Sequence, residues 1–280
     1  MSIEYKINQD ICTECNQCVR SCPSANTIIK KESGLIIDTE TCIKCGHCAA
    51  VCSNGAITCN DQELPLVQSV DIKSEDIFNL LRQKRSVRIY HDKVIADEII
   101  NDIIDVASFS ATASNNRTLK VSVLKGEEVS ACSKLLSGLM LTKLKKISNP
   151  VFRFLFSKKI PKNFKNPDKL SSFCEVMQAT VDGKIDRMFF KAPVVVVLTH
   201  PVSNKKWGRV DCSIAATNAT LYAESLGLNS CVVGFAEGFN DNIEARKSLK
   251  IPKNYIAGSI FVLGYGKEKY FRIPKRERID

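Results

Sequence analysis

Apolar residues follow two different patterns along this chain, and the pattern changes near residue 60. Before that point they come in short β-prone pieces, at Tyr5–Ile7, Thr27–Ile29, Leu35–Ile37 and Ala56–Thr58. Such pieces predict short strands joined by turns. After that point apolar residues recur at helical spacing or in longer runs. The chain is therefore expected to hold two domains, a small one at residues 1–62 and a larger one at residues 74–280.

Two helices are predicted where the larger domain begins. Ser74 is placed to cap the first, since acidic residues follow it in the first turn and Ile77–Leu81 carry apolar residues at helical spacing. The second has an apolar stripe along Ile99–Ala107. Residues 63–73, which include Pro65 and scattered polar residues, are expected to link the two domains.

The larger domain mixes further helices and strands. Strands are predicted at Val121–Leu124, Val194–Leu198, Cys231–Gly234 and Ile256–Gly264. An alanine-rich helix is predicted at Asp211–Leu226, with Gly227 ending it. Neither G-x-G-x-x-G nor G-x-x-x-x-G-K-[ST] follows a predicted strand, so no Rossmann or P-loop nucleotide site is indicated. The expected fold class is α+β.

Composition is that of a packed protein without a membrane span. Apolar residues make up 44% of the 280 positions and charged residues 25%, which is far from the composition of disordered chains. The N-terminus lacks the basic and apolar regions of a secretory signal. The longest apolar stretch, Val194–Leu198, is too short to cross a bilayer. A cytoplasmic protein is expected.

Charge is distributed unevenly along the chain, whose net charge is +10. Residues 1–62 carry a small acidic excess, whereas residues 134–169 hold ten Lys or Arg against the single Asp168. A nucleic-acid site is one interpretation of this basic run. No nucleic-acid motif accompanies it, so a solvated segment is favoured and no nucleic-acid partner is expected.

Eight of the 13 cysteines form two runs with the spacing C-x2-C-x2-C-x3-C. The first run is Cys12, Cys15, Cys18 and Cys22, and the second is Cys42, Cys45, Cys48 and Cys52. A disulfide scaffold would need a small secreted chain, and zinc motifs rarely use three cysteines at two-residue spacing before a fourth. The spacing favours two [4Fe-4S] clusters. The other five cysteines lack it and are expected to be small buried apolar residues.

The fourth cysteine of each run is expected to close the other run's cluster. One ligand set is then Cys12, Cys15, Cys18 and Cys52, and the other is Cys42, Cys45, Cys48 and Cys22. With flanking strands and a repeat of thirty residues, residues 1–62 resemble the two-fold 2[4Fe-4S] ferredoxin of bacteria. Ser53 departs from that family, which usually has proline there. His47 is expected to neighbour a cluster without ligating it.

A second resemblance begins at the end of the first predicted helix. The string Leu81–Tyr90 is similar to the R-R-S-x-R-x-[FY] motif that opens FMN-dependent nitroreductases. The resemblance implies that Arg85, Ser86 and Arg88 hold the flavin phosphate and the polar edge of the ring. Two guanidinium groups around a hydroxyl suit a dianion, although basic residues that end a helix often only complement its dipole.

Another segment in the same order resembles the family. Residues 107–117 are similar to its A-x-x-A-P-S-x-x-N-x-Q segment, with Thr112 in the serine place and Asn115 in the asparagine place. Two residues depart from the pattern. Ala111 replaces the proline, and Arg117 replaces the glutamine that normally touches the flavin. The resemblance implies flavin contacts for Thr112, Asn115 and Arg117.

Two more stretches complete the resemblance over residues 74–280. Residues 211–234 match the family's D-x-x-x-A helix and G-L-G-x-x-x-x-x-G turn, which implies that the backbone at Val233 and Gly234 approaches the flavin. Residues 263–274 resemble the closing strand and basic tail, which implies positive charge from Lys267 and Arg272 near the phosphate. Residues 134–175 are expected to form a variable lid or dimer arm.

Together the resemblances imply an enzyme in which FMN receives single electrons through two [4Fe-4S] clusters and reduces a small nitroaromatic, quinone or enone. The expected donor is an external ferredoxin-type protein, with NADPH and NADH left open, and a homodimer is expected. No nucleophile or carboxylate pair needs a role, so no catalytic residue is assigned. The alternatives are an electron carrier whose nitroreductase-like domain holds no flavin, and a redox-sensing nucleic-acid binder.

Overall fold

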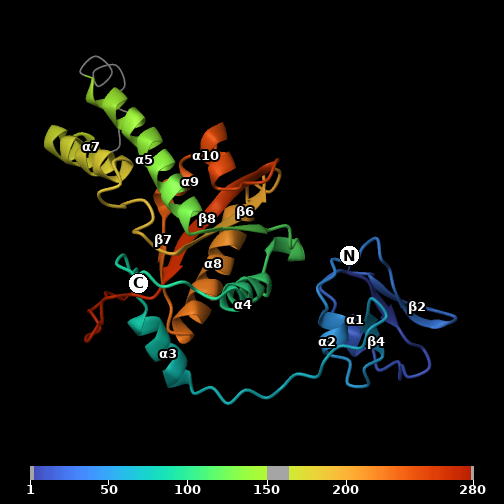
Figure 1. Ribbon diagram of the computed structural model, residues 1–280. Coiled ribbons are helices and arrows are strands. Elements are labelled where there is room, and N and C mark those ends of the chain that lie inside the picture. The colour runs from blue at the N-terminus through green and yellow to red at the C-terminus, as the bar shows by residue number, and fades with distance from the viewer. Residues whose placement is uncertain (1–2, 150–163, 279–280) are drawn as a thin grey trace. The chain divides into compact units, whose positions relative to one another are not determined.

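The computed structural model describes residues 3–149 and 164–278, and the chain divides into two compact units (Figure 1). The first comprises Met1–Ile72 together with Thr112–Asn116, and the second comprises Lys73–Ala111 and Arg117–Asp280. Residues 150–163 of the expected arm lie outside the described residues. Each unit has a core of its own.

Two antiparallel strand pairs and two short helices build the first unit. The pairs are β1 (Tyr5–Ile7) with β4 (Ile57–Cys59), and β2 (Ile28–Lys31) with β3 (Gly34–Ile37). The helices are α1 (Gln17–Ser21) and α2 (His47–Ala50). Buried Ile28, Leu35 and Ile57 pack with Cys18 and Cys48 in the core. A domain of this size buries little apolar surface, so a bound metal cluster stabilises it substantially.

The sequence repeat of the first unit is also a repeat in backbone conformation. Glu14 and Lys44 have φ of 51° and 56°, and Asn16 and Gly46 have φ of 58° and 77°. Both pairs are thirty residues apart and precede a helix. The left-handed conformation turns the chain sharply between the cysteines. At Gly46 glycine is also needed for space, because a Cβ would lie 2.7 Å from Tyr5 Oη.

A four-stranded antiparallel sheet forms the centre of the second unit, in the order β5-β6-β8-β7. The strands are β5 (Lys120–Lys125), β6 (Val194–Pro201), β7 (Asn229–Val232) and β8 (Tyr255–Gly264). The strands predicted at 121–124, 194–198 and 256–264 are present. The predicted strand 231–234 ends earlier, since Gly234 begins a helix. The expected α+β class is confirmed.

Helices cover both faces of this sheet (Figure 1). Along β6, Val194, Val196 and Leu198 pack under α4 (Asp97–Ser108) and α8 (Gly208–Ser225), while Val195 and Val197 point to the other face. That other face packs against α5 (Glu127–Ser148) and α10 (Ile243–Ser248). Burial on both faces explains why β6 is a continuous apolar run and not an alternating one.

Helices at the margin are less buried. The helix α3 (Ser74–Gln83) has no buried residue, and its N-cap is Lys73, so Ser74 is the first helical residue and does not cap the helix. The helix α7 (Pro167–Val181) packs on α5 through a cluster that includes Leu141, Leu144, Leu170 and Met177. Two further short helices of the described residues are η1 (Ala113–Asn115) and α9 (Gly234–Glu237).

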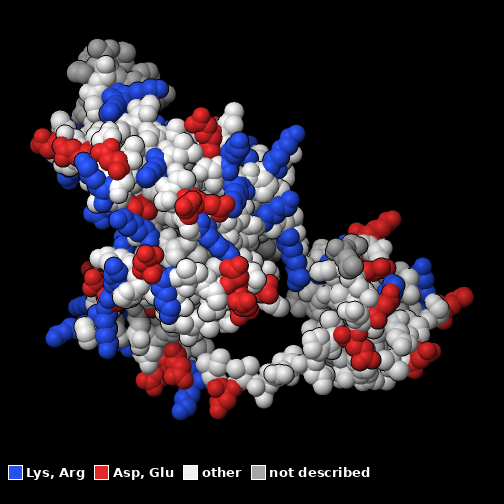
Figure 2. All heavy atoms as spheres, viewed as in Figure 1, with Lys and Arg blue, Asp and Glu red and all other residues white. Residues whose placement is uncertain are grey.

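The described part of the basic run is helical surface. Figure 2 shows Lys and Arg side chains spread over the visible face of the second unit. Lys143, on α5, lies with Nζ 4.6 Å from the centroid of the Phe239 ring and donates to the Gly238 carbonyl at 3.4 Å. At least one lysine of the run therefore supports the turn after α9 (Gly234–Glu237).

Gly264 is a position where the packing permits no side chain. A Cβ there would lie 2.6 Å from Tyr90 Cδ1 and 2.9 Å from Pro193 Cδ. Gly264→Ala is therefore expected to lower the free energy of unfolding by about 1–3 kcal/mol, the usual cost of overpacking. Urea denaturation measures this change.

The matched control is Gly138→Ala on α5, where the nearest atom to a Cβ is Val181 Cγ2 at 3.9 Å. Alanine favours a helix interior over glycine, so this variant is expected to gain about 0.5–1 kcal/mol. Equal stability of the two variants would contradict the packing at Gly264.

Candidate functional site

Two cavities in the first unit are each lined by four cysteines. One contains Cys12, Cys15, Cys18 and Cys52, and the other contains Cys22, Cys42, Cys45 and Cys48. The last cysteine of each run thus lines the cavity of the other run. Each cavity thus brings together the four cysteines of one predicted ligand set, and four thiolates around a shared cavity are what a cubane cluster needs. Their role as ligands stays a prediction.

Hydrogen-bond donors face several of the sulfurs. The Ala56 N–H donates to Cys52 Sγ at 3.3 Å, and the Lys44 N–H donates to Cys42 Sγ at 3.4 Å. His47 Nδ1 lies 3.2 Å from Cys45 Sγ, which makes His47 a neighbour of a sulfur as expected. Such donors stabilise thiolate charge. Burial disfavours the thiolate and raises the pKa of Cys48 to about 11. A bound metal overcomes this effect of burial because it displaces the thiol proton.

In the second unit, the Arg85–Arg88 segment is held between β7 and the end of β8. Ser86 pairs with Ser230 in a parallel bridge, and the Val87 N–H donates to the Ser230 carbonyl at 3.1 Å. Two residues on, the Lys267 N–H donates to the Ile89 carbonyl at 3.0 Å. The structure therefore brings three separate parts of the sequence together, namely the Arg-Ser-x-Arg motif, β7 and the Lys267 segment.

The two guanidinium groups of the motif have different surroundings. Arg85 Nη1 donates to the carbonyls of Arg82 and Lys84, both at 2.7 Å, so it satisfies the C-terminal end of α3. Arg88 is exposed, and its Nη1 donates to the Ser86 carbonyl at 3.1 Å. Its Cζ lies 5.7 Å from the centroid of the Phe190 ring. Arg85 Nη1 thus bonds the end of α3, whereas Arg88 Nη1 bonds the backbone of the motif itself.

Two half-buried polar residues lie behind the motif, and sequence reasoning missed both of them. Asn229 Nδ2 donates to Glu224 Oε1 at 3.3 Å, while Asn229 Oδ1 accepts from the Gly266 N–H at 3.0 Å. Burial raises the pKa of Glu224, and the positive charges of Lys84 and Arg85 partly offset this rise. The sequence feature that could have revealed them is Asn229 itself, which replaces the second glycine of the family's G-L-G turn. Asn229 links α8 to the Lys267 segment, which follows β8.

The other predicted flavin residues lie in several places. The Val233 N–H donates to the Ile260 carbonyl at 2.8 Å, and a Cβ at Gly234 would meet nothing within 4 Å, so the chain at Gly234 has open space beside it. Thr112 and Asn115 belong to the first unit, where Asn115 Nδ2 donates to the Ile43 carbonyl at 2.9 Å. Arg117 and exposed Arg272 belong to the second. Flavin contacts of these residues stay predictions.

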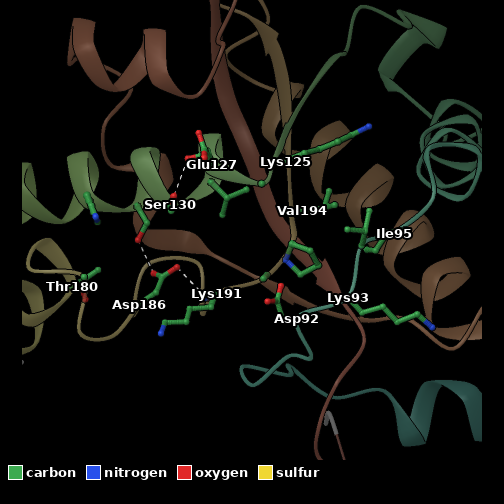
Figure 3. Close-up of a pocket in the computed structure, with 18 of the residues that line it drawn as sticks. Asp92, Lys93, Ile95, Lys125, Glu127, Ser130, Thr180, Asp186, Lys191 and Val194 are labelled. Carbon is green, nitrogen blue, oxygen red and sulfur yellow. Dashed lines mark hydrogen bonds between the residues drawn. The ribbon is translucent and has the colours of Figure 1, made fainter.

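A pocket of about 510 Å³ opens beside the start of α5 (Figure 3). Buried Ile95, Val129 and Val194 contribute to its apolar part, and Lys125 on its edge pairs with Asp97 at 2.6 Å. None of the predicted flavin residues is among the described residues that line it. The pocket is therefore separate from the Arg85–Arg88 segment.

The cysteines outside the two runs differ in burial, and their reactivity is expected to follow. Burial raises the pKa of Cys132 to about 11 and that of Cys212 to about 12. Since the thiolate is the reactive form, both are expected to stay unlabelled by a thiol reagent at pH 8 in the native protein, whereas half-buried Cys59 and Cys174 react. Peptide mapping after timed labelling measures this. Rapid labelling of Cys212 before unfolding would contradict it.

Among the described residues no helix combines the length and apolarity needed to cross a membrane. The profile of the nitroreductase family matches residues 81–265, and the profile of a 4Fe-4S dicluster domain matches residues 4–53. The first match covers more than half of the chain.

Individual proteins agree with these matches. An Archaeoglobus fulgidus protein, provisionally named NADH dehydrogenase/NAD(P)H nitroreductase, is 25% identical over 199 residues, covering 70% of this chain and 88% of that protein. The 4-nitrobenzoate reductase of Pseudomonas putida is 23% identical over 224 residues, covering 69% and 98%. The crystal structure of a Desulfitobacterium hafniense nitroreductase with bound FMN has a TM-score of 0.54 at 20% identity, covering 72% and 96%. The chain belongs to the nitroreductase family and carries a 4Fe-4S dicluster domain ahead of its nitroreductase domain.

Proposed function

We propose that this protein is an FMN-dependent oxidoreductase that receives single electrons through two [4Fe-4S] clusters and reduces a small organic acceptor. The observation that carries the proposal is the Arg85–Arg88 segment, which backbone hydrogen bonds hold against β7 and the Lys267 segment. Exposed Arg88, the Ser86 hydroxyl and a lysine then lie on one edge of the sheet. Membership of the nitroreductase family supports a flavin phosphate as the anion for this edge.

The residues of the chain suit both cofactors. The two cavities lined by cysteines supply the eight thiolates of two clusters. For the flavin, Arg85, Ser86, Arg88 and Lys267 would hold the phosphate, and the open space at Gly234 leaves room for a ring to approach the backbone. Thr112, Asn115, Arg117, Val233 and Arg272 are the further candidates that the family pattern places at the flavin.

The clusters and the FMN have different roles because they transfer different numbers of electrons. A cluster supplies one electron at a time, while FMN supplies two-electron reduction to an organic acceptor. The protein's own contribution is to bind, to orient and to keep cationic groups beside the phosphate. No side chain of the described residues needs to act as a nucleophile in such a reaction.

An external ferredoxin-type protein is the proposed electron donor, because clusters fused to the flavin domain would be redundant if NADPH reduced FMN directly. The Archaeoglobus fulgidus relative bears NADH and NAD(P)H in its name, which makes this the comparison to run. Stopped-flow mixing with reduced ferredoxin and with NADPH measures flavin reduction by each. Fast reduction by NADPH in protein stripped of its clusters would contradict the proposed donor.

The proposed acceptor is a nitroaromatic, quinone or enone. The relative that is a 4-nitrobenzoate reductase supports the nitroaromatic class. An anaerobic screen in which each acceptor is mixed with the reduced protein, with flavin re-oxidation as the readout, ranks the three classes. Re-oxidation by none of them at a rate above that of buffer would contradict this part of the proposal.

A homodimer is proposed as the working form, with the flavin at the subunit interface. Apolar side chains that a single chain leaves in water support it. On α3, Ile77, Phe78 and Leu81 are about half exposed. So are Trp207, the residue before α8, and Val210 on α8. Contiguous exposed apolar surface marks interaction sites. Light scattering after size-exclusion chromatography tests this, and a monomer at micromolar concentration would contradict it.

Anaerobic purification followed by a visible spectrum tests the flavin itself. Bound FMN adds resolved flavin bands to the broad absorption of the clusters, and denaturation releases it for chromatography. Protein that carries clusters but releases no FMN, even after incubation with it, would favour the alternative of a non-catalytic electron carrier.

A further inference from the structure

We propose that Phe190 is a positioning residue for Arg88, held in place by a turn that Asp186 organises. The inference rests on the proposed function, because it concerns how Arg88 is oriented to receive the flavin. Phe190 is distant from Arg88 in sequence and belongs to none of the family's motifs. The guanidinium group of Arg88 nevertheless lies over the Phe190 ring.

Asp186 anchors the turn with both of its carboxylate oxygens. Oδ1 accepts from the Met188 and Phe189 N–H groups, both at 2.9 Å, and Oδ2 accepts from the Lys191 N–H at 3.0 Å. The Ser133 hydroxyl on α5 also donates to Oδ1, at 2.6 Å. Hydrogen bonds to a carboxylate are stronger than neutral ones. The turn is thereby tied to a helix that packs on the sheet (Figure 3).

This anchoring supports a backbone conformation that side chains disfavour. Phe190 and Lys191 both have left-handed φ, 60° and 54°. A side chain disfavours this conformation, which persists only where the surroundings impose it. Phe189 on one side is fully buried in the core, and Ala192 on the other is buried too. The turn therefore fixes the backbone on both sides of Phe190, whose partly buried ring packs against the core.

The ring meets a cation that is exposed and that also lies beside Cys231. Arg88 Cζ lies 5.7 Å from the Phe190 ring centroid, within the range of a cation–π interaction, and Nη1 donates to the Ser86 carbonyl. A free arginine side chain samples many rotamers, and each must be given up when an anion binds. A ring and a carbonyl that restrict the guanidinium group beforehand reduce that cost. Arg88 is thus pre-oriented.

The test compares FMN dissociation constants of the purified protein after flavin removal and reconstitution. Phe190→Leu is expected to raise the dissociation constant about fivefold, as loss of an exposed cation–π contact does, while Phe190→Tyr keeps the ring and stays within twofold of wild type, a range set by measurement error. The matched control is Tyr255→Leu, which removes a ring 4.7 Å from Lys120 Nζ at the opposite end of β8. It is expected to leave FMN binding unchanged.

A double-mutant cycle separates positioning from general stability. In an Arg88→Gln background, Phe190→Leu is expected to have no further effect on FMN binding, because the residue acts through Arg88. An equal loss in both backgrounds would overturn the proposal.

A second readout needs no flavin. The NMR signal of the Arg88 Nε–H group, assigned by its loss in Arg88→Gln, is expected to move when Phe190→Leu removes the ring current, and to move likewise in Asp186→Asn. An unmoved signal would overturn the inference. If the signal moves but the protein takes up no FMN, the inference about the orientation of Arg88 holds and the proposed flavin function is rejected.

Discussion

The double variant Cys12→Ser with Cys52→Ser is expected to lose one cluster and keep the other. Although these cysteines come from different runs, they line the same cavity. Bound iron should therefore fall from about eight to about four atoms per chain, the content of a single [4Fe-4S] cluster. Iron and acid-labile sulfide analysis of anaerobically purified protein measures this.

The informative partner is Cys12→Ser with Cys22→Ser, which alters two cysteines of the same run. Because Cys22 lines the other cavity, this variant is expected to damage both clusters and to retain well under four iron atoms per chain, a threshold set by one cluster's content. Cys22→Ser with Cys42→Ser, which alters one cavity only, controls for the number of serines and should keep about four. The reverse order of iron contents would show that each run ligates its own cluster.

Arg88→Gln is expected to weaken FMN binding by about 10- to 100-fold without changing the melting temperature. A hydrogen bond from a charged donor contributes about 1.5–3 kcal/mol, and each 1.4 kcal/mol is tenfold in affinity. The side chain is exposed and donates to the carbonyl of Ser86, only two residues away, so folding loses little. Isothermal titration with FMN and differential scanning calorimetry measure the two quantities.

Arg85→Gln is the matched comparison. Arg85 donates to the carbonyls of Arg82 and Lys84 at the end of α3, so its loss is expected to cost about 1 kcal/mol of stability as well as FMN affinity. The two arginines of one motif should then differ in thermal stability and not only in binding. Wild-type FMN affinity in Arg88→Gln would remove Arg88 from the flavin site.

Much of the fold could be predicted from local pattern. The run Val194–Leu198 reads as a buried strand because both sheet faces are covered, and it lies within β6. The C-x2-C-x2-C-x3-C spacing indicates clusters because it depends on a few neighbouring residues. Caps and element ends were less accurate, as at Ser74 and Gly234, because a helix end depends on the contacts of its last turn.

Only part of the candidate site could be predicted from local sequence pattern. The Arg-Ser-x-Arg motif is a string of neighbours and could be recognised, but the different surroundings of Arg85 and Arg88 could not. Asn229, which bonds Glu224, contacts Gly266 at a separation of 37 residues, and Phe190 contacts Arg88 at a separation of about a hundred. No periodicity of the sequence encodes such contacts.

The sequence by itself therefore determined the chemistry that short spacings can carry, namely two sets of thiolates and a basic motif of the nitroreductase kind. Only the tertiary structure decided which arginine bonds the end of a helix, and that Asp186 holds Phe190 against Arg88. The physical reason is that side-chain type and spacing act locally along the chain. Orientation at a site is set by packing and hydrogen bonds between segments that meet only once the sheet has formed.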